Sequence, residues 1–182
     1  DPALTQTELH VIVDLAGHHE IQSDAVVDAV RRLCGLFVRL SPNDACLAAV
    51  SLLKVTSTFP SARQVLDVDV ILNALSRKAH SIEFRHLMTL VAATLTSPVI
   101  AHKVGVMITM QATTWTAGNC AACVECIGKT LERLESRDTD SLASVRDAWK
   151  PAASELHDIV CDGANTLSVD RLRHVADVMS DV

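Results

Sequence analysis

Three cysteines at regular spacing are the first residues in this chain that could do chemistry. Cys120, Cys123 and Cys126 form a Cys-x2-Cys-x2-Cys run, which is part of the ligand spacing of an iron–sulfur cluster. The run lacks its fourth ligand, because Thr130 stands where that spacing requires Cys. Zinc would need a second Cys or His pair nearby, and none is evident. We therefore expect cysteines packed in a core, with no metal and no cofactor.

The other reactive side chains do not fall into a catalytic pattern. None of the eight histidines belongs to an H-E-x-x-H motif, and His18-His19 stands at an expected helix end, where imidazole can meet free carbonyls. There is no G-x-S-x-G, no P-loop and no G-x-G-x-x-G sequence. The sequence therefore predicts a protein without catalytic residues, which is not an enzyme.

A basic cluster is the strongest candidate site for binding. Its members fall between Arg77 and Lys103, where Glu83 is the single acidic residue. The candidate surface consists of Arg77, Lys78, Arg85, His86 and Lys103. It could meet RNA phosphates or an acidic partner, and the alternative is an ordinary solvated face. Aromatic platforms for stacking bases are nearly absent, since Trp115 and Trp149 are the two tryptophans.

The elements that must position these residues all read as helices. Apolar residues recur at helical spacing, and nine starts carry a capping residue. These starts are Thr5, Ser23, Ser41, Ser61, Ser81, Ser97, Thr116, Asp140 and Ser168. Thr5 with Glu8 and Ser61 with Gln64 form capping boxes. Pro151 falls inside the penultimate helix, so we expect a kink or two short helices there.

The stretch from His80 to Thr113 is the most apolar part of the chain. It reads as two helices that are apolar on more than one face, so we expect neighbours to sandwich both. Polar residues interrupt it, so it is a poor membrane span. Residues 61–112 also carry five basic and three acidic side chains, whereas the whole chain has a net charge of −6. Lys54, by contrast, falls off the apolar stripe of its helix and is expected in solvent.

Length and composition limit the class of protein. A chain of 182 residues is one domain, and because it does not begin with Met we expect a fragment of a longer chain. Residues 1–20 show no signal peptide. Five cysteines lie in apolar helical patterns, which indicates free thiols in a reducing intracellular compartment. Hydrophobic residues make up 49% of the chain and aromatics 3%, with a mean hydropathy of +0.26. This excess suggests an apolar surface covered by a partner or by missing repeats.

The predicted helix starts repeat along the chain. Intervals between odd-numbered helices are 36, 40, 35 and 52 residues, and between even-numbered ones 38, 36 and 43. The odd helices also look alike, as in LSPNDACLAAVSLLKV, HSIEFRHLMTLVAATL, TAGNCAACVECIGKTL and LSVDRLRHVADVM. A period of this size with two helices per unit predicts an all-α protein stacked as antiparallel helix pairs, an α-solenoid. The alternative is an irregular helical bundle.

This pattern resembles the first helix of the repeats of roughly 37 residues found in organellar RNA-processing proteins, and less closely armadillo/HEAT repeats. The pentatricopeptide pattern is not matched, because there is no Tyr and no Gly-centred turn between paired helices. The resemblance implies a non-enzymatic scaffold that binds proteins, within an RNA-processing assembly in the mitochondrion or cytoplasm. Two alternatives stay open: direct RNA binding through the basic middle units, and a self-assembling viral or structural protein. No membrane partner is expected, and the oligomeric state is not determined.

Overall fold

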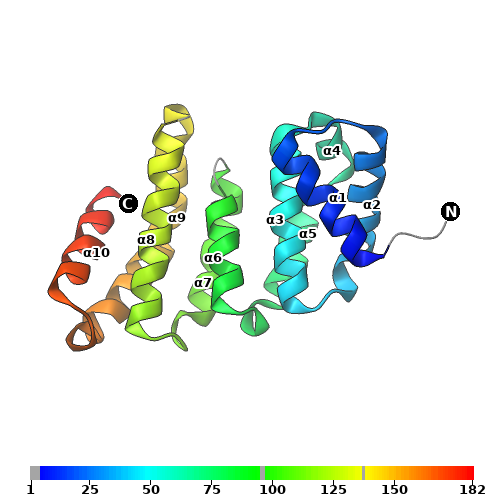
Figure 1. Cartoon of the computed structure of the whole chain (residues 1–182). Helices are drawn as coiled ribbons and strands as arrows, with labels where there is room; N and C mark the ends of the chain where they lie inside the picture. The colour runs from blue at the N-terminus through cyan, green and yellow to red at the C-terminus, as the bar shows by residue number, and fades with distance from the viewer. Residues whose placement is uncertain (1–4, 95–96, 137) are drawn as a thin grey trace. The chain divides into compact units, whose positions relative to one another are not determined.

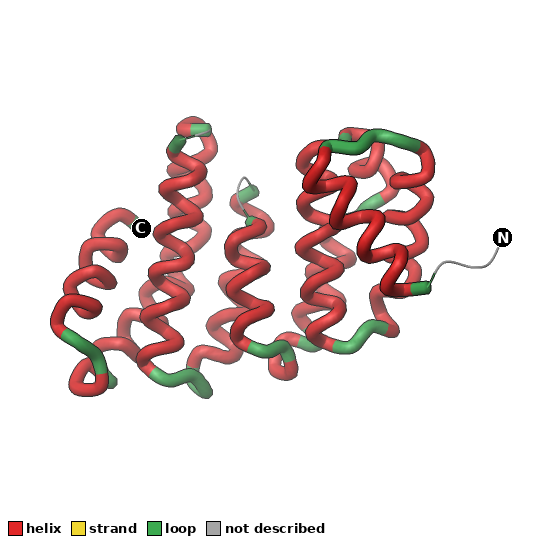
Figure 2. Tube along the Cα trace, viewed as in Figure 1, coloured by secondary structure: helices red, strands yellow, loops and turns green. Residues whose placement is uncertain are grey.

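The computed structural model describes residues 5–94, 97–136 and 138–182. Within these ranges every regular element is a helix: ten α-helices and three short 3-10 helices, with no strand (Figure 2). The predicted all-α class is confirmed. The helices fall into two compact units, Asp1–His86 and Leu87–Val182, and each unit is described by itself.

The first unit is built around a long central helix (Figure 1, blue to cyan). Its α-helices are α1 (Gln6–His19), α2 (Asp24–Leu36), α3 (Pro42–Thr58), α4 (Pro60–Val65) and α5 (Val68–Ser76), followed by the start of α6 (Phe84–Ala93). Two 3-10 helices, η1 (Phe37–Arg39) and η2 (Ala79–Ser81), complete it. The α3 helix packs against α1, α4 and α5, while α2 packs against α1 and α4. Ten residues of α3 are buried, so α3 forms the core of this unit.

The second unit is centred on the longest helix (Figure 1, green to red). Besides the rest of α6 it contains α7 (Pro98–Ala112), α8 (Ala117–Glu135), α9 (Thr139–Asp162), η3 (Ala164–Thr166) and α10 (Val169–Asp181). The α9 helix packs against both α7 and α8, and α10 packs against α8 and α9. Trp149 of α9 is the largest fully buried side chain among the described residues, and it anchors the core of this unit.

Six of the predicted helix starts are confirmed by side-chain caps. In each, the hydroxyl oxygen accepts a backbone N–H of the first turn. The residues are Thr5, Ser23, Ser41, Ser97, Thr116 and Ser168. Thr5 also completes its predicted capping box, since the Glu8 carboxylate accepts the Thr5 N–H at 2.7 Å.

Three predicted caps are wrong. The α9 helix is capped by Asp138 in place of Asp140, since the Asp138 side chain accepts the Ser141 N–H. The Ser61 helix begins instead with Pro60 at its first position and stops after Val65. The predicted single helix is divided there because the Asp67 side chain caps a new helix, accepting the N–H groups of Asp69 and Val70. Ser81 lies at the end of η2, and α6 begins at Phe84. The described chain therefore has ten α-helices where nine were predicted.

Pro151 lies inside an uninterrupted helix, so of the two predicted alternatives, a kink or two short helices, the second is wrong. The α9 helix runs from Thr139 to Asp162, although a proline removes one internal hydrogen bond at a cost of about 3 kcal/mol. Packing on both sides of the proline offsets this cost, because Trp149 and Ala152 are both buried. Gly105 of α7 faces this part of α9, where an added Cβ would make an ordinary contact at 3.4 Å with Ala152 Cβ.

Candidate functional site

The residues of the predicted basic surface lie in different surroundings and make different contacts. Arg77 is exposed at the end of α5. The Lys78 side chain extends to η1 and the residue after it, where Nζ donates to the carbonyl oxygens of Val38 at 2.9 Å and Leu40 at 2.6 Å. Its ammonium group therefore holds α5 against the preceding segment of the first unit. Lys103 belongs to the second unit, on α7, and is half-buried.

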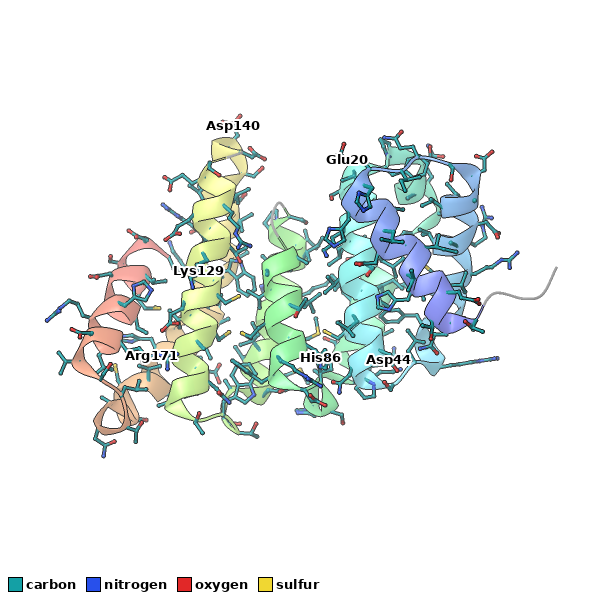
Figure 3. The ribbon with its side chains drawn as sticks, in the orientation of Figure 1. Glu20, Asp44, His86, Lys129, Asp140 and Arg171 are labelled. Carbon is teal, nitrogen blue, oxygen red and sulfur yellow. The ribbon has the colours of Figure 1, made fainter. Side chains whose placement is uncertain are left out.

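Arg85 and His86 are brought together around the acidic residue of the cluster. Arg85 Nε lies 2.9 Å from Glu83 Oε2, and His86 Nδ1 lies 3.9 Å from the same oxygen. The His86 side chain is 13% exposed. Its backbone carbonyl accepts the Cys46 thiol at 3.2 Å, and Figure 3 labels His86 and Asp44 at corresponding ends of α6 and α3. The side chains of Arg85 and His86 therefore both face the Glu83 carboxylate, within the first unit.

A polar network that sequence reasoning missed joins α1 to α3. His10 lies 2.9 Å from Ser51 Oγ, and Ser51 donates its hydroxyl proton to Asp14 Oδ1 at 3.0 Å. A serine has one hydroxyl proton, so the Ser51 oxygen must accept from His10, which requires a proton on Nε2. Lys54 extends the network, with Nζ 3.7 Å from Asp14 Oδ1 and 3.2 Å from His18 Nε2.

The prediction that Lys54 points into solvent is only partly right: the side chain is 35% exposed, but its Nζ lies against Asp14 and His18 of α1. The hydrogen-bond order also differs from a hydrolytic triad, in which His lies between Ser and Asp and accepts the serine proton. Here the serine lies between the two, and Ser51 is buried. The network binds α1 to α3. Its sequence signal is the spacing of His10, Asp14 and His18 at every fourth residue, which places all three on one helical face.

The cysteines of the Cys-x2-Cys-x2-Cys run lie along one helix, α8. Cys120 and Cys123 are buried as predicted, and Cys126 is half-buried. Burial raises the pKa of the Cys120 thiol to about 11 and the pKa of the Cys123 thiol well above its ordinary value. Among the described residues no three His, Cys, Asp or Glu side chains gather in a way that could hold a metal ion.

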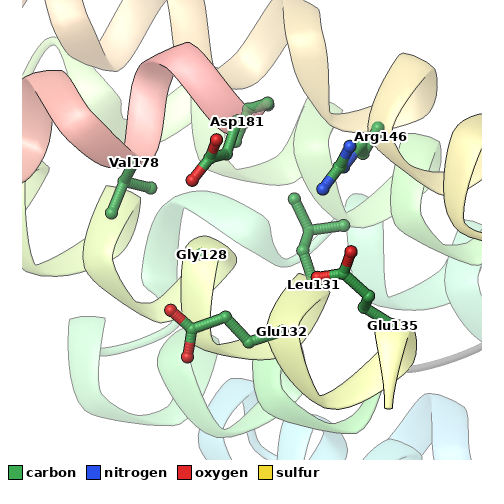
Figure 4. Close-up of a pocket in the computed structure, with 8 residues that line it drawn as sticks. Gly128, Leu131, Glu132, Glu135, Arg146, Val178 and Asp181 are labelled. Carbon is green, nitrogen blue, oxygen red and sulfur yellow. The ribbon is translucent and has the colours of Figure 1, made fainter. Parts of the chain in front are cut away.

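A small cavity lies between α8, α9 and α10 (Figure 4). Its volume is about 40 Å³, and its polar lining comes from Glu132, Glu135, Arg146 and Asp181. Arg146 Nε is buried without a hydrogen-bond partner. A polar space of this size can hold a few water molecules, one of which could accept the Nε–H. The cavity is too small for a metabolite.

An exposed apolar stripe on α7 is the second feature that sequence reasoning missed. Val99, Val106 and Met110 are 55%, 43% and 38% exposed. Their spacing of seven and four residues places them on one face of the helix, together with Lys103. The opposite face packs on α9 and is buried at Val104, Met107 and Ile108. The expectation that neighbours sandwich α7 is therefore wrong on one side.

Within the described residues, no helix combines the length and the apolar character needed to cross a lipid bilayer. Comparison of the chain with models of protein families, with curated proteins and with solved structures finds no match.

Proposed function

We propose that this chain is a non-enzymatic helical-repeat scaffold that binds other proteins. The observation that carries the proposal is the exposed apolar stripe of α7, formed by Val99, Val106 and Met110. Single apolar residues on a surface need no explanation, but an aligned set on one helical face favours a protein interface. An amphipathic segment of a partner could cover the stripe, as in helix-in-groove recognition.

The contacts inside each unit support the stacked helix pairs of an α-solenoid. Side chains that hold neighbouring helices together are separated by 36 residues between His18 and Lys54 and by 40 between Cys46 and His86. In the second unit, the Cys126 thiol reaches the Met88 carbonyl 38 residues away. These separations match the predicted interval between equivalent helices, as expected where each repeat packs on the next.

The setting that we propose is an RNA-processing ribonucleoprotein assembly in the mitochondrion or cytoplasm, on the resemblance of the repeats alone. The protein-binding role is favoured over direct RNA binding, because Lys78 and Arg85 already have partners within the first unit. Phosphate binding needs cations that can exchange their partners for the nucleic acid backbone.

The experiment compares two valine substitutions in otherwise identical tagged proteins. Val106→Asp places a charge in the α7 stripe, while Val70→Asp does the same at an exposed valine of α5. Affinity capture from source cells, with RNase treatment and crosslinking mass spectrometry, should give a stoichiometric partner crosslinked to α7. That partner should be lost in Val106→Asp and retained in Val70→Asp. Equal capture by both variants would contradict the proposal.

The two alternatives have their own readouts. Fluorescence anisotropy with single-stranded RNA at low salt tests direct binding, and RNA affinity that falls in Arg77→Glu would favour the RNA-binding alternative. Light scattering over a range of protein concentrations tests self-assembly, and reversible oligomers that dissociate in Val106→Asp would favour the self-assembling alternative.

A further inference from the structure

The contact between Lys78 and η1 brings two basic segments of the first unit together. Lys78 Nζ donates to the carbonyl oxygens of Val38 and Leu40. Residues 29–43 and 70–82 carry five Lys and Arg residues between them and no Asp or Glu, although the whole chain has a net charge of −6. The structure therefore joins two segments without acidic residues that are 40 positions apart in the sequence.

Two arginines of these segments are available to a partner. Arg39 is the last residue of η1 and Arg77 follows α5, and both residues are exposed. Neither side chain forms a hydrogen bond or an ion pair with another residue that the structure describes. Arg31 and Arg32, by contrast, lie 3.7 Å and 2.8 Å from the Asp28 carboxylate. Arg39 and Arg77 therefore carry charge that the first unit does not neutralise.

The two arginines are close enough to bind one segment of a partner. Arg77 precedes Lys78, whose Nζ lies 2.9 Å and 2.6 Å from the carbonyl oxygens on either side of Arg39. Bond lengths then place the Cα atoms of Arg39 and Arg77 no more than about 16 Å apart. An extended peptide covers that distance in about five residues. A short segment can therefore contact both guanidinium groups.

An exposed valine adjoins Arg39. Val38 is 73% exposed, the highest value among the exposed large hydrophobic residues of the described chain. Its backbone is held on both sides, because Lys78 binds its carbonyl oxygen and the Leu40 N–H donates to the carbonyl of buried Phe37 at 3.3 Å. An apolar side chain on a fixed backbone loses little conformational entropy when a partner covers it.

We propose that Val38, Arg39 and Arg77 form a docking surface for an acidic protein segment, independent of the α7 stripe. Carboxylates of the segment bind the guanidinium groups, which present paired N–H donors, and an apolar residue of the segment covers Val38. Nucleic acid fits this surface less well. Two available cations release few counterions from a phosphate backbone, and the neighbouring aromatic residue, Phe37, is buried and cannot stack on a base.

The test measures binding of the whole chain to a fluorescein-labelled peptide of sequence EDELDE, by fluorescence anisotropy at low salt. The affinity should fall about tenfold in Arg39→Glu and in Arg77→Glu, and it should decrease as sodium chloride is added. The matched control is Arg173→Glu, at an exposed arginine of α10 in the second unit. It makes the same change in net charge and should bind the peptide as the unmodified chain does.

A second peptide, EDESDE, separates the apolar contact from the charges. It should bind the unmodified chain more weakly than EDELDE, and Val38→Ser should weaken binding of EDELDE alone. Circular dichroism should show unchanged folding in every variant, because the substituted residues are exposed. The absence of peptide binding at low salt would overturn the proposal, as would an equal loss in Arg173→Glu. Tighter binding of a six-nucleotide single-stranded RNA, lost in Arg39→Glu, would also overturn it and assign the surface to nucleic acid.

Discussion

Asn43 and Glu83 exchange two hydrogen bonds between α3 and the start of α6, across a sequence separation of 40 residues. Asn43 Oδ1 accepts the Glu83 N–H at 2.9 Å, and Asn43 Nδ2 donates to Glu83 Oε1 at 2.8 Å. A capping box makes the same reciprocal pair within one helix. Here two helices share it, so α3 fixes the residue at which α6 begins.

Substitution of Asn43 by alanine should destabilise the protein by about 1–2 kcal/mol, because it removes both bonds at the start of α6. Urea denaturation followed by circular dichroism measures the loss. The matched control is Asn165→Ala, at an exposed position of η3, which should change the free energy of unfolding by less than about 0.5 kcal/mol. Equal losses in the two variants would show that the Asn43–Glu83 pair contributes nothing.

Substitution of Gly128 by alanine should loosen α10 from α8. A Cβ at Gly128 would lie 2.7 Å from Val178 Cγ1, and relief of that clash should cost about 1–3 kcal/mol. The same change at Gly35 of α2 meets no atom within 4 Å and should raise the free energy of unfolding by up to about 1 kcal/mol. Thermal unfolding should therefore show a lower Tm for Gly128→Ala and a higher Tm for Gly35→Ala than for the unmodified protein.

A double variant tests whether the contact itself causes the effect. Val178→Ala removes the methyl groups that a new Cβ would meet. It should therefore recover part of the loss caused by Gly128→Ala, as a positive coupling in a double-mutant cycle. Strictly additive losses would mean that Gly128 matters for a reason other than Val178.

Substitution of Ser51 by alanine should weaken the attachment of α1 to α3. The change leaves Asp14 and His10 without their shared partner and should cost about 1–3 kcal/mol. Hydrogen exchange should accelerate in α1 more than in α8, since the network joins α1 and α3 alone. Ser144→Ala, at an exposed serine that donates to the Ser141 carbonyl, serves as the control. Unchanged exchange in α1 would argue against the proposed role of the network.

The buried thiols should make the protein sensitive to alkali. Burial raises the pKa of Cys46 to about 12 and that of Cys34 to about 11, from an ordinary value of 9.0. The unfolded chain loses these protons near pH 9 while the folded chain keeps them, so stability falls as the pH rises from about 9 to 11. Urea denaturation at several pH values across this range should show the free energy of unfolding decreasing as the pH rises.

Cys46→Ala should reduce that slope, because one titrating group is removed. Val50→Ala, at a buried position of the same helix, should lower stability at every pH and leave the slope unchanged. The same slope in Cys46→Ala and in the unmodified protein would assign the alkaline loss to other groups.

Much of the helical architecture could be predicted from local chemistry. A hydroxyl side chain before an apolar stripe satisfies the first N–H groups of its own helix, which needs no distant residue. This is why Thr5, Ser41 and Thr116 mark the observed starts. The burial of Cys120 and Cys123 was predicted in the same way, from their place on an apolar helical stripe.

The sequence by itself determined the all-α class and most helix starts, because these depend on residues within one or two turns. Contacts between distant residues decided the rest. The start of α6 depends on Asn43, and the continuity of α9 at Pro151 depends on packing around Trp149. The position of Lys54 depends on Asp14 and His18. The exposure of Val99, Val106 and Met110 could not be predicted, since an apolar helix shows which residues can be buried but not how many neighbours will cover them.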